Sequence, residues 1–177
     1  PPNGFGKGGA VCNDGILVAN STLFNNHSAH AASGWTSPSS PVFGGAICNY
    51  GNSTLTNSTF VANTARGDES AGGNAFGGGI FNTNGTTLLV NCTLSANAAQ
   101  AGSGGTNYGG ALANAGGVVT LRNTIVANGN AGDNSYGTLT DAGHNLSSDA
   151  SCNFSGAGSL NNTDPILGPL DDYGGPT

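Results

Sequence analysis

The chain has 177 residues, of which 32 are Gly, and only 7% of its side chains are charged, with a formal net charge of −6. Ordinary globular domains carry about 25% charged residues, so uncharged polar side chains must cover most of this surface. Lys and Arg together number three, which leaves little to bind a phosphate backbone or an anionic membrane and argues against nucleic-acid partners. No stretch approaches ~18 apolar residues, so membrane insertion is not expected.

One pattern occurs four times in chain order, near 5–28, 43–65, 76–97 and 108–128. Each copy begins with a Gly pair or triplet, then an aliphatic residue, and an Asn two residues after it. Short β-branched runs of period two follow, bounded by Gly or Asn, which is typical of strands. The sequence contains no ten-residue apolar stripe of period 3.6, so no helix is predicted.

Short strands repeated in this way predict an all-β fold, a right-handed parallel β-helix (β-solenoid) of about five coils stacked ~4.8 Å apart. The repeat length varies, and the variation falls between units, at 33–41 and 68–75. Residues 134–154 are expected to form a fifth, modified coil. Residues 155–177, which contain Pro165 and Pro169, predict an irregular tail folded over an end or along a side. The whole of 1–177 is expected to be one domain.

Stacking of the repeats predicts columns of equivalent residues. Two inward aliphatic columns are expected, Val11, Ile47, Ile80 and Leu112, and Leu23, Phe60, Leu94 and Ile125. A structural column of Asn13, Asn49, Asn82 and Asn114 is expected at a bend, where amides can bond backbone groups and each other. An outward column of Thr22, Thr59, Thr93 and Thr124 is expected as well.

The Gly pairs suggest positive φ or close approach of neighbouring coils. Phe43, Phe76 and Tyr108 directly precede the Gly runs, with Phe5 nearby, and predict a short aromatic stack that serves packing.

The four cysteines leave two interpretations open. Cys12 and Cys48 share a repeat position, so their Cα atoms are expected ~5 Å apart, within disulfide range. Parallel Cβ directions make a reduced ladder the alternative. Cys92 and Cys152 are the remaining candidate pair.

The acidic residues do not recur at one repeat position, so stacking builds no acidic patch of the kind that glycan-cleaving enzymes need. His27 and His30 lack a Cys or acidic neighbour and favour a solvated pair over a metal site. We therefore expect no catalytic residue, no metal and no cofactor.

Two parts of the chain resemble a known bacterial group. The Gly-Gly-Ala-Ile and Phe-x-x-Asn units are similar to those of polymorphic outer-membrane proteins. The Gly-His-Asn-Leu-Ser-Ser-Asp segment at 143–149, together with 162–170 and the terminal Gly-Gly-Pro-Thr, resembles the choice-of-anchor Q domain family. The resemblance implies a secreted, surface-attached right-handed β-helix without an assigned activity.

The resulting expectation is a non-catalytic, secreted structural or adhesive module at a cell surface. Its expected partners are extracellular glycans or a second copy, stacked head to tail into filaments. The alternatives are a carbohydrate-active enzyme (a polysaccharide lyase or glycoside hydrolase) and an ice-binding protein that uses the Thr column.

Overall fold

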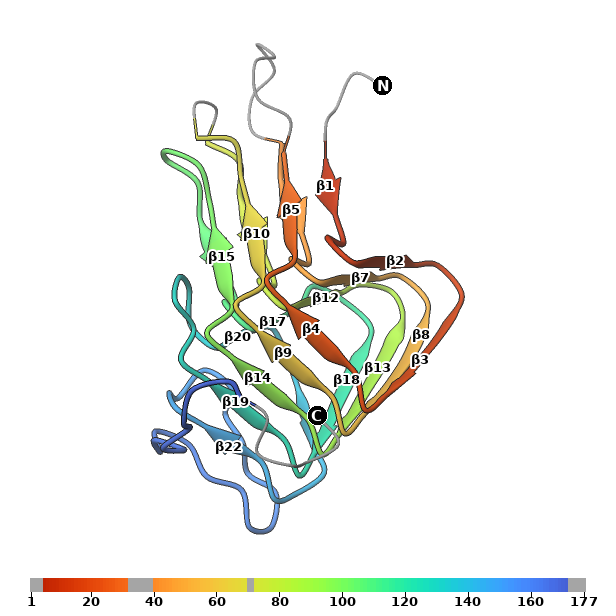
Figure 1. Ribbon diagram of the computed structural model, residues 1–177, viewed down its shortest axis with the longest axis vertical. Coiled ribbons are helices and arrows are strands. Elements are labelled where there is room, and N and C mark those ends of the chain that lie inside the picture. Colours follow the sequence, from red (N-terminus) through yellow and green to blue (C-terminus); the bar gives the residue numbers. More distant parts are fainter. Residues whose placement is uncertain (1–4, 32–39, 70–71, 172–177) are drawn as a thin grey trace.

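A computed structural model describes residues 5–31, 40–69 and 72–171. These residues form twenty-two strands and no helix, and all strand pairs are parallel. The predicted all-β class and the stacking of repeats into a parallel solenoid are confirmed. Figure 1 shows a prism with three walls, from which an arm of two sheets projects.

Three five-stranded sheets form the walls of the prism. The first contains β2 (Val11–Asn13), β7 (Ile47–Asn49), β12 (Ile80–Asn82), β17 (Leu112–Asn114) and β20 (Ser135–Tyr136). The second contains β3 (Ile16–Asn20), β8 (Asn52–Thr56), β13 (Thr86–Val90), β18 (Val118–Arg122) and β21 (Thr140–Asp141). The third contains β4 (Leu23–Asn25), β9 (Thr59–Val61), β14 (Thr93–Ser95), β19 (Ile125–Ala127) and β22 (Leu146–Ser147).

Two further sheets lie back to back and form the arm. One contains β1 (Gly6–Lys7), β6 (Val42–Phe43), β11 (Ala75–Phe76) and β16 (Asn107–Tyr108). The other contains β5 (Ser28–His30), β10 (Thr64–Arg66) and β15 (Ala98–Gln100). The described strands that lead into the variable stretches, β5 and β10, belong to the arm and not to the walls of the prism (Figure 1). Residues 32–39 and 70–71 of these stretches lie outside the described residues.

The expectation of about five coils is not confirmed, because the solenoid has about three full turns. Only the first three repeats contain all five strands. The fourth repeat lacks a counterpart of β5, and the modified coil supplies only the three two-residue strands β20, β21 and β22.

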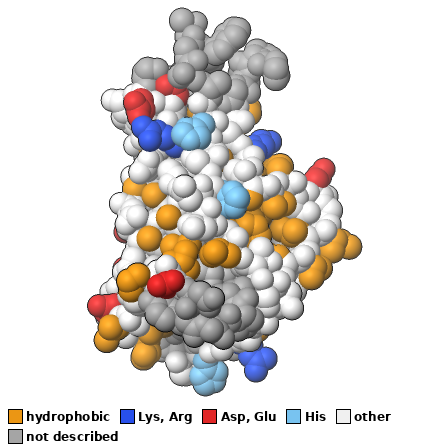
Figure 2. Space-filling view, in the orientation of Figure 1, with side chains coloured by type: hydrophobic (Ala, Val, Ile, Leu, Met, Phe, Trp, Pro, Cys, Tyr) orange, Lys and Arg blue, Asp and Glu red, His pale blue; other side chains and the backbone are white. Residues whose placement is uncertain are grey.

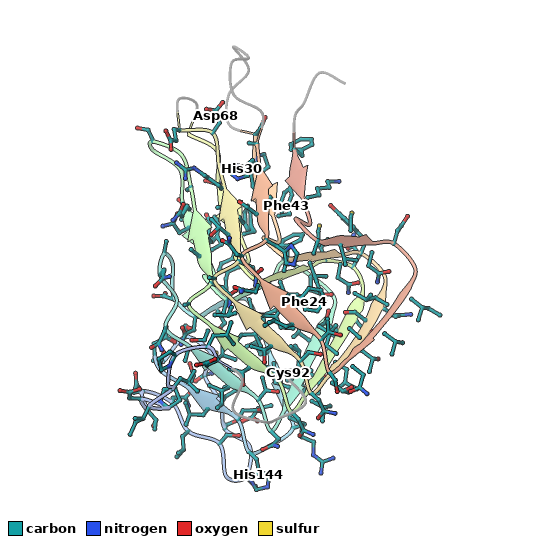
Figure 3. All side chains as sticks on the ribbon, in the orientation of Figure 1. Phe24, His30, Phe43, Asp68, Cys92 and His144 are labelled. Carbon is teal, nitrogen blue, oxygen red and sulfur yellow. The ribbon has the colours of Figure 1, made fainter. Side chains whose placement is uncertain are left out.

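The prism core confirms the first aliphatic column and corrects the second. Val11, Ile47, Ile80 and Leu112 are register partners, and the last three are fully buried. The second inward column is Phe24, Phe60, Leu94 and Val126. Leu23 is 47% exposed and pairs with Thr59, and Ile125 pairs with Thr93, so these two predicted members each lie one residue before the observed inward column. Figure 3 shows Phe24 inside the prism.

The arm is thin because small residues fill it. Its interior consists of Ala29, Val42, Ala65, Ala75 and Ala99. The Gly pairs lie where arm and prism meet. Gly44 has φ +65, a backbone conformation that favours Gly. A Cβ on Gly45 would lie 2.0 Å from the carbonyl oxygen of Gly78 in the next coil, so the close approach of the two coils requires Gly at this position.

The C-terminal end of the solenoid is closed by a compact cap. Residues 143–163 fold over the last strands, and Leu160 forms a parallel bridge with Leu146. The modified coil therefore continues beyond the predicted boundary at 154. The tail then runs back beside the prism, where Leu167 to Asp171 lie against β9 and β14.

Candidate functional site

The predicted Asn column forms a buried hydrogen-bonded ladder along the first wall. Asn13 Nδ2 donates to Asn49 Oδ1 at 2.7 Å, Asn49 Nδ2 to Asn82 Oδ1 at 2.8 Å, and Asn82 Nδ2 to Asn114 Oδ1 at 3.0 Å. Each amide also donates to carbonyls of the adjoining turn, such as Gly51 for Asn49. The ladder satisfies backbone groups that the bend leaves unpaired, which is a structural task.

Two more Asn ladders were not predicted. One is buried where the third wall meets the arm, and there Asn63 Nδ2 donates to Asn97 Oδ1 at 3.0 Å and to the carbonyl of Phe24. The other is exposed between the second and third walls. It consists of Asn20, Asn57, Asn91 and Asn123, joined by side-chain bonds of 2.8–3.1 Å. The signal in the sequence that could have predicted these two ladders is an Asn that recurs beside a turn in successive repeats.

The predicted outward Thr column does not form. Thr59 and Thr93 are register partners, but their neighbours in the column are Leu23 and Ile125. Thr124 is fully buried, and its hydroxyl accepts a bond from the amide of Cys92. The array on which the ice-binding alternative rested is therefore absent from the described walls.

Two aspartates hold the cap together. Asp141 accepts bonds from the amides of Gly143 and Gly156 and from Asn145 and Ser159. Burial by itself raises its pKa, but these hydrogen bonds outweigh burial and lower the pKa overall. The same balance lowers the pKa of Asp149, which accepts bonds from Ser151 and from the amide of Asn134.

The other charged and metal-ligand side chains form no larger cluster in the described part of the chain. Glu69 pairs with Arg66 on the exposed arm. His30 Nε2 lies 2.7 Å from Ser28 Oγ, and the ring of His27 contacts Phe24 edge-on. Within the described ranges no three His, Cys, Asp or Glu side chains cluster as metal ligands, and no helix could span a membrane. Figure 2 shows how sparse charged side chains are on one face of the molecule.

All four cysteines are free thiols, so neither candidate disulfide is formed. Cys12 and Cys48 are register partners on the outer face of the first wall, as expected from the repeat. Burial raises the pKa of Cys48 to about 12, and burial also raises the pKa of Cys92 and of Cys152. Cys12 is the exposed member of the set.

The aromatic stack lies in the concave angle between the arm and the first wall. On the arm, Phe43, Phe76 and Tyr108 are register partners with ring centroids 5.4 and 4.5 Å apart. From the wall, Phe81 lies 4.7 Å from Phe43, and Tyr136 lies 4.7 Å from Tyr108. We call these five residues the aromatic corner.

The N-terminal end of the corner differs from the expectation. Lys7, not Phe5, is the register partner of Phe43, and its Nζ lies 4.9 Å from the ring centroid of Tyr50. A hydrogen bond to Tyr50 is the main cause that raises the pKa of Lys7. Phe5 is 45% exposed.

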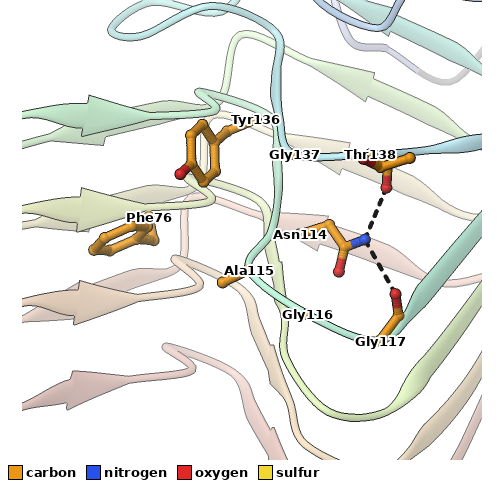
Figure 4. Close-up of a pocket in the computed structure, with 8 residues that line it drawn as sticks. All are labelled: Phe76, Asn114, Ala115, Gly116, Gly117, Tyr136, Gly137 and Thr138. Atoms are coloured by element: carbon orange, nitrogen blue, oxygen red, sulfur yellow. Dashed lines mark hydrogen bonds between the residues drawn. The ribbon is translucent and has the colours of Figure 1, made fainter.

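The C-terminal end of the corner opens into a shallow cup of about 370 Å³. Its lining consists of Phe76, Asn114, Ala115, Gly116, Gly117, Tyr136, Gly137 and Thr138 (Figure 4). Two aromatic rings therefore form one side, and a Gly-rich backbone forms the floor. The cup was not predicted, because Tyr136 lies in the modified coil outside the four clear repeats.

Comparisons with family models, with curated proteins and with solved structures found no match to this chain.

Proposed function

We propose that the chain is a non-catalytic structural and adhesive module of an extracellular surface, wound as a right-handed parallel β-helix. One observation carries the proposal: the buried polar side chains of the described residues are paired within the protein, and none of them is left unpaired to face a bound substrate. Every buried side-chain nitrogen and oxygen in the described part of the chain has a hydrogen-bond partner. Catalytic sites instead aim polar or titratable groups at the position of a substrate.

The carboxylates support the same proposal. Glycan cleavage needs two carboxyl groups on either side of the scissile bond. Asp141 and Asp149 are engaged with the amides of the cap, and Glu69 with Arg66. Asp14 and Asp133 are exposed; Asp14 lies on the first coil and Asp133 directly precedes the modified coil, so they are at opposite ends of the solenoid.

The surface and the family resemblance support the location and the partners. A rigid rod with few charges suits a role outside the cell at a surface, as in the choice-of-anchor Q and polymorphic outer-membrane families. The partners proposed are extracellular glycans and a second copy of the chain. No nucleic acid is proposed, because the chain has three Lys and Arg in total.

A turnover assay tests the proposal. The purified protein is incubated with pectin, alginate and host-type glycans, and new reducing ends and unsaturated products are measured over time. We expect none above a heat-treated control. Turnover that a single Asp→Asn substitution abolishes, in a variant with unchanged thermal stability, would contradict the proposal and establish a carbohydrate-active enzyme.

A further inference from the structure

The aromatic corner gathers much of the aromatic content of the chain in one place. The sequence contains seven Phe, four Tyr and one Trp. Five of these twelve form the corner, and Tyr50 packs beside them. Packing in the protein interior accounts for the aromatic ring of Phe81, which is 4% exposed. It does not account for the ring of Tyr136, which is 43% exposed. An exposed ring at the end of a half-buried row indicates a contact with something outside the chain.

The row of rings ends at the cup. The arm sheet ends at β16 and the first wall ends at β20, so neither Tyr108 nor Tyr136 is followed by another residue of its column. The plane of Tyr136 is tilted by 60° from Tyr108 and by 68° from Phe76, so Tyr136 does not continue the stack. Its ring borders the open cup (Figure 4).

The lining of the cup is uncharged but offers hydrogen-bonding groups. None of its eight residues is Asp, Glu, Lys, Arg or His. Asn114 is occupied, because its Nδ2 donates to the carbonyls of Thr138 and Gly117. Tyr136 and Thr138 are exposed, and the hydroxyl of each can donate and accept a hydrogen bond.

We propose that the cup binds a unit of a neutral oligosaccharide, with the C–H face of the pyranose ring against Tyr136. The ring face of Tyr carries partial negative charge, which attracts the weakly positive C–H groups of a sugar. The hydroxyls of the sugar meet those of Tyr136 and Thr138 and the backbone of the floor. This inference rests on the proposed adhesive function, whose partner it names.

The observations favour a neutral sugar over two other occupants. An anionic sugar or a charged peptide end would find no counter-charge in the lining. A Pro-rich peptide also docks on aromatic grooves, but it needs an extended groove. The cup measures about 370 Å³, at the small end of ligand sites, which suits a mono- or disaccharide unit.

The test is calorimetric titration of the intact protein with four probes: β-glucan oligosaccharides, manno-oligosaccharides, alginate oligosaccharides and a Pro-rich peptide. We expect saturable binding of at least one neutral series. Tyr136→Ala should weaken that binding by about tenfold or more, since it removes the ring face. Tyr136→Phe should keep most of the affinity. Val118→Ala, at a 50% exposed position on another wall, is the matched control and should bind like the wild type.

Three outcomes would overturn the inference: no neutral probe binds, binding is unaffected by Tyr136→Ala, or only alginate or peptide binds. Circular dichroism of Tyr136→Ala shows whether a loss of binding reflects unfolding. If it does, Thr138→Val replaces it as the test, because Thr138 is exposed and its lost hydroxyl should still weaken binding. A negative result in the binding test leaves the proposed function intact, because only turnover in the glycan-cleavage assay contradicts that proposal. Turnover refutes the proposed function, whereas an unchanged affinity of Tyr136→Ala refutes the inference alone.

Discussion

At the residue scale, the turn between the third wall and the arm holds a backbone position that Ala fits poorly. Asn26, Ala62, Ala96 and Asn128 occupy this position with φ between 54 and 57. The left-handed region costs a residue with a Cβ about 1–2 kcal/mol, but Asn tolerates it. Two repeats thus have the favoured residue and two do not.

We predict that Ala62→Asn stabilises the protein by about 1 kcal/mol, because the exposed Asn relieves backbone strain without disturbing packing. Urea unfolding of the variant and the wild type measures the difference. Ala150→Asn is the control, since Ala150 is also exposed but has no positive φ. Equal effects at the two positions would show that the strain argument is wrong.

The thiols give a second prediction at this scale. With a pKa of about 12, Cys48 is protonated near pH 8, and burial protects Cys92 and Cys152 in the same way. Brief treatment of the native protein with iodoacetamide should therefore label Cys12 alone. After unfolding without reductant, all four cysteines should react. Mass spectrometry that finds only two reactive thiols, with Cys12 and Cys48 linked, would contradict the reduced ladder.

At the element scale, the buried Asn ladder should be sensitive to loss of a single donor. Asn49 Nδ2 faces four acceptors: the carbonyls of Gly51 and Thr86, the side-chain oxygen of Asn82 and the hydroxyl of Thr87. Asn49→Asp replaces this donor with a buried carboxylate among acceptors, and we expect a loss of about 3 kcal/mol or more.

Asn91→Asp on the exposed ladder is the matched control. Its Nδ2 donates to Asn57 Oδ1 at 3.1 Å, but water can replace the partner, so we expect a loss of about 1 kcal/mol or less. Urea midpoints measure both variants. Similar losses would mean that burial does not set the energy of the ladder.

The cap should loosen in acid. Because the folded-state pKa of Asp141 and of Asp149 is lowered, their ionised forms stabilise the cap at pH values above the unfolded pKa of about 3.9. That contribution is lost as the pH falls through the lowered folded-state pKa. Pepsin digestion at stepwise lower pH should therefore cleave within 143–163 before it cleaves the prism.

Asp141→Asn should make the cap more susceptible to cleavage throughout the pH series, since the amide cannot accept the same bonds with a full charge. Asp133→Asn, at an exposed position, should leave the digestion pattern unchanged. Cleavage of prism and cap together at every pH would contradict a separately stabilised cap.

The comparison of sequence with structure is also clearest for elements. The column from Val11 to Leu112 is visible in the sequence because a Gly pair marks its place in every repeat. The second column is displaced because the letters Asn-Ser-Thr occur at both 20–22 and 57–59, which equates Asn20 with Asn57, whereas Ser21 and Asn57 take the left-handed turn position. Backbone φ sets the register, and this turn position holds Ser21 in the first repeat but Asn57, Asn91 and Asn123 in the next three. The arm was missed because its strands are only two or three residues long.

At the scale of the whole molecule, the two ends of the solenoid differ. Strands β1 to β5 all lie at the edges of their sheets, so among the described residues no strand pairs with the outer side of this first coil. Next to this edge, Ile16 is 83% and Val18 is 71% exposed. The C-terminal end offers only two-residue strands beneath the cap. Head-to-tail filaments would have to displace that cap, whereas two N-terminal edges can pair directly.

We therefore predict self-association that stops at a dimer, through the N-terminal edges of two copies. Sedimentation velocity over a concentration series should show the 17.2 kDa chain in equilibrium with a species of twice its mass. Val18→Lys should shift the equilibrium to monomer, because a charge beside the edge opposes pairing. Val118→Lys lies on the same wall within β18, an interior strand, and should associate like the wild type. An open-ended series of species, or threads by negative-stain microscopy, would instead support the head-to-tail filament. A monomer at all concentrations would show that the edge does not pair with a second copy.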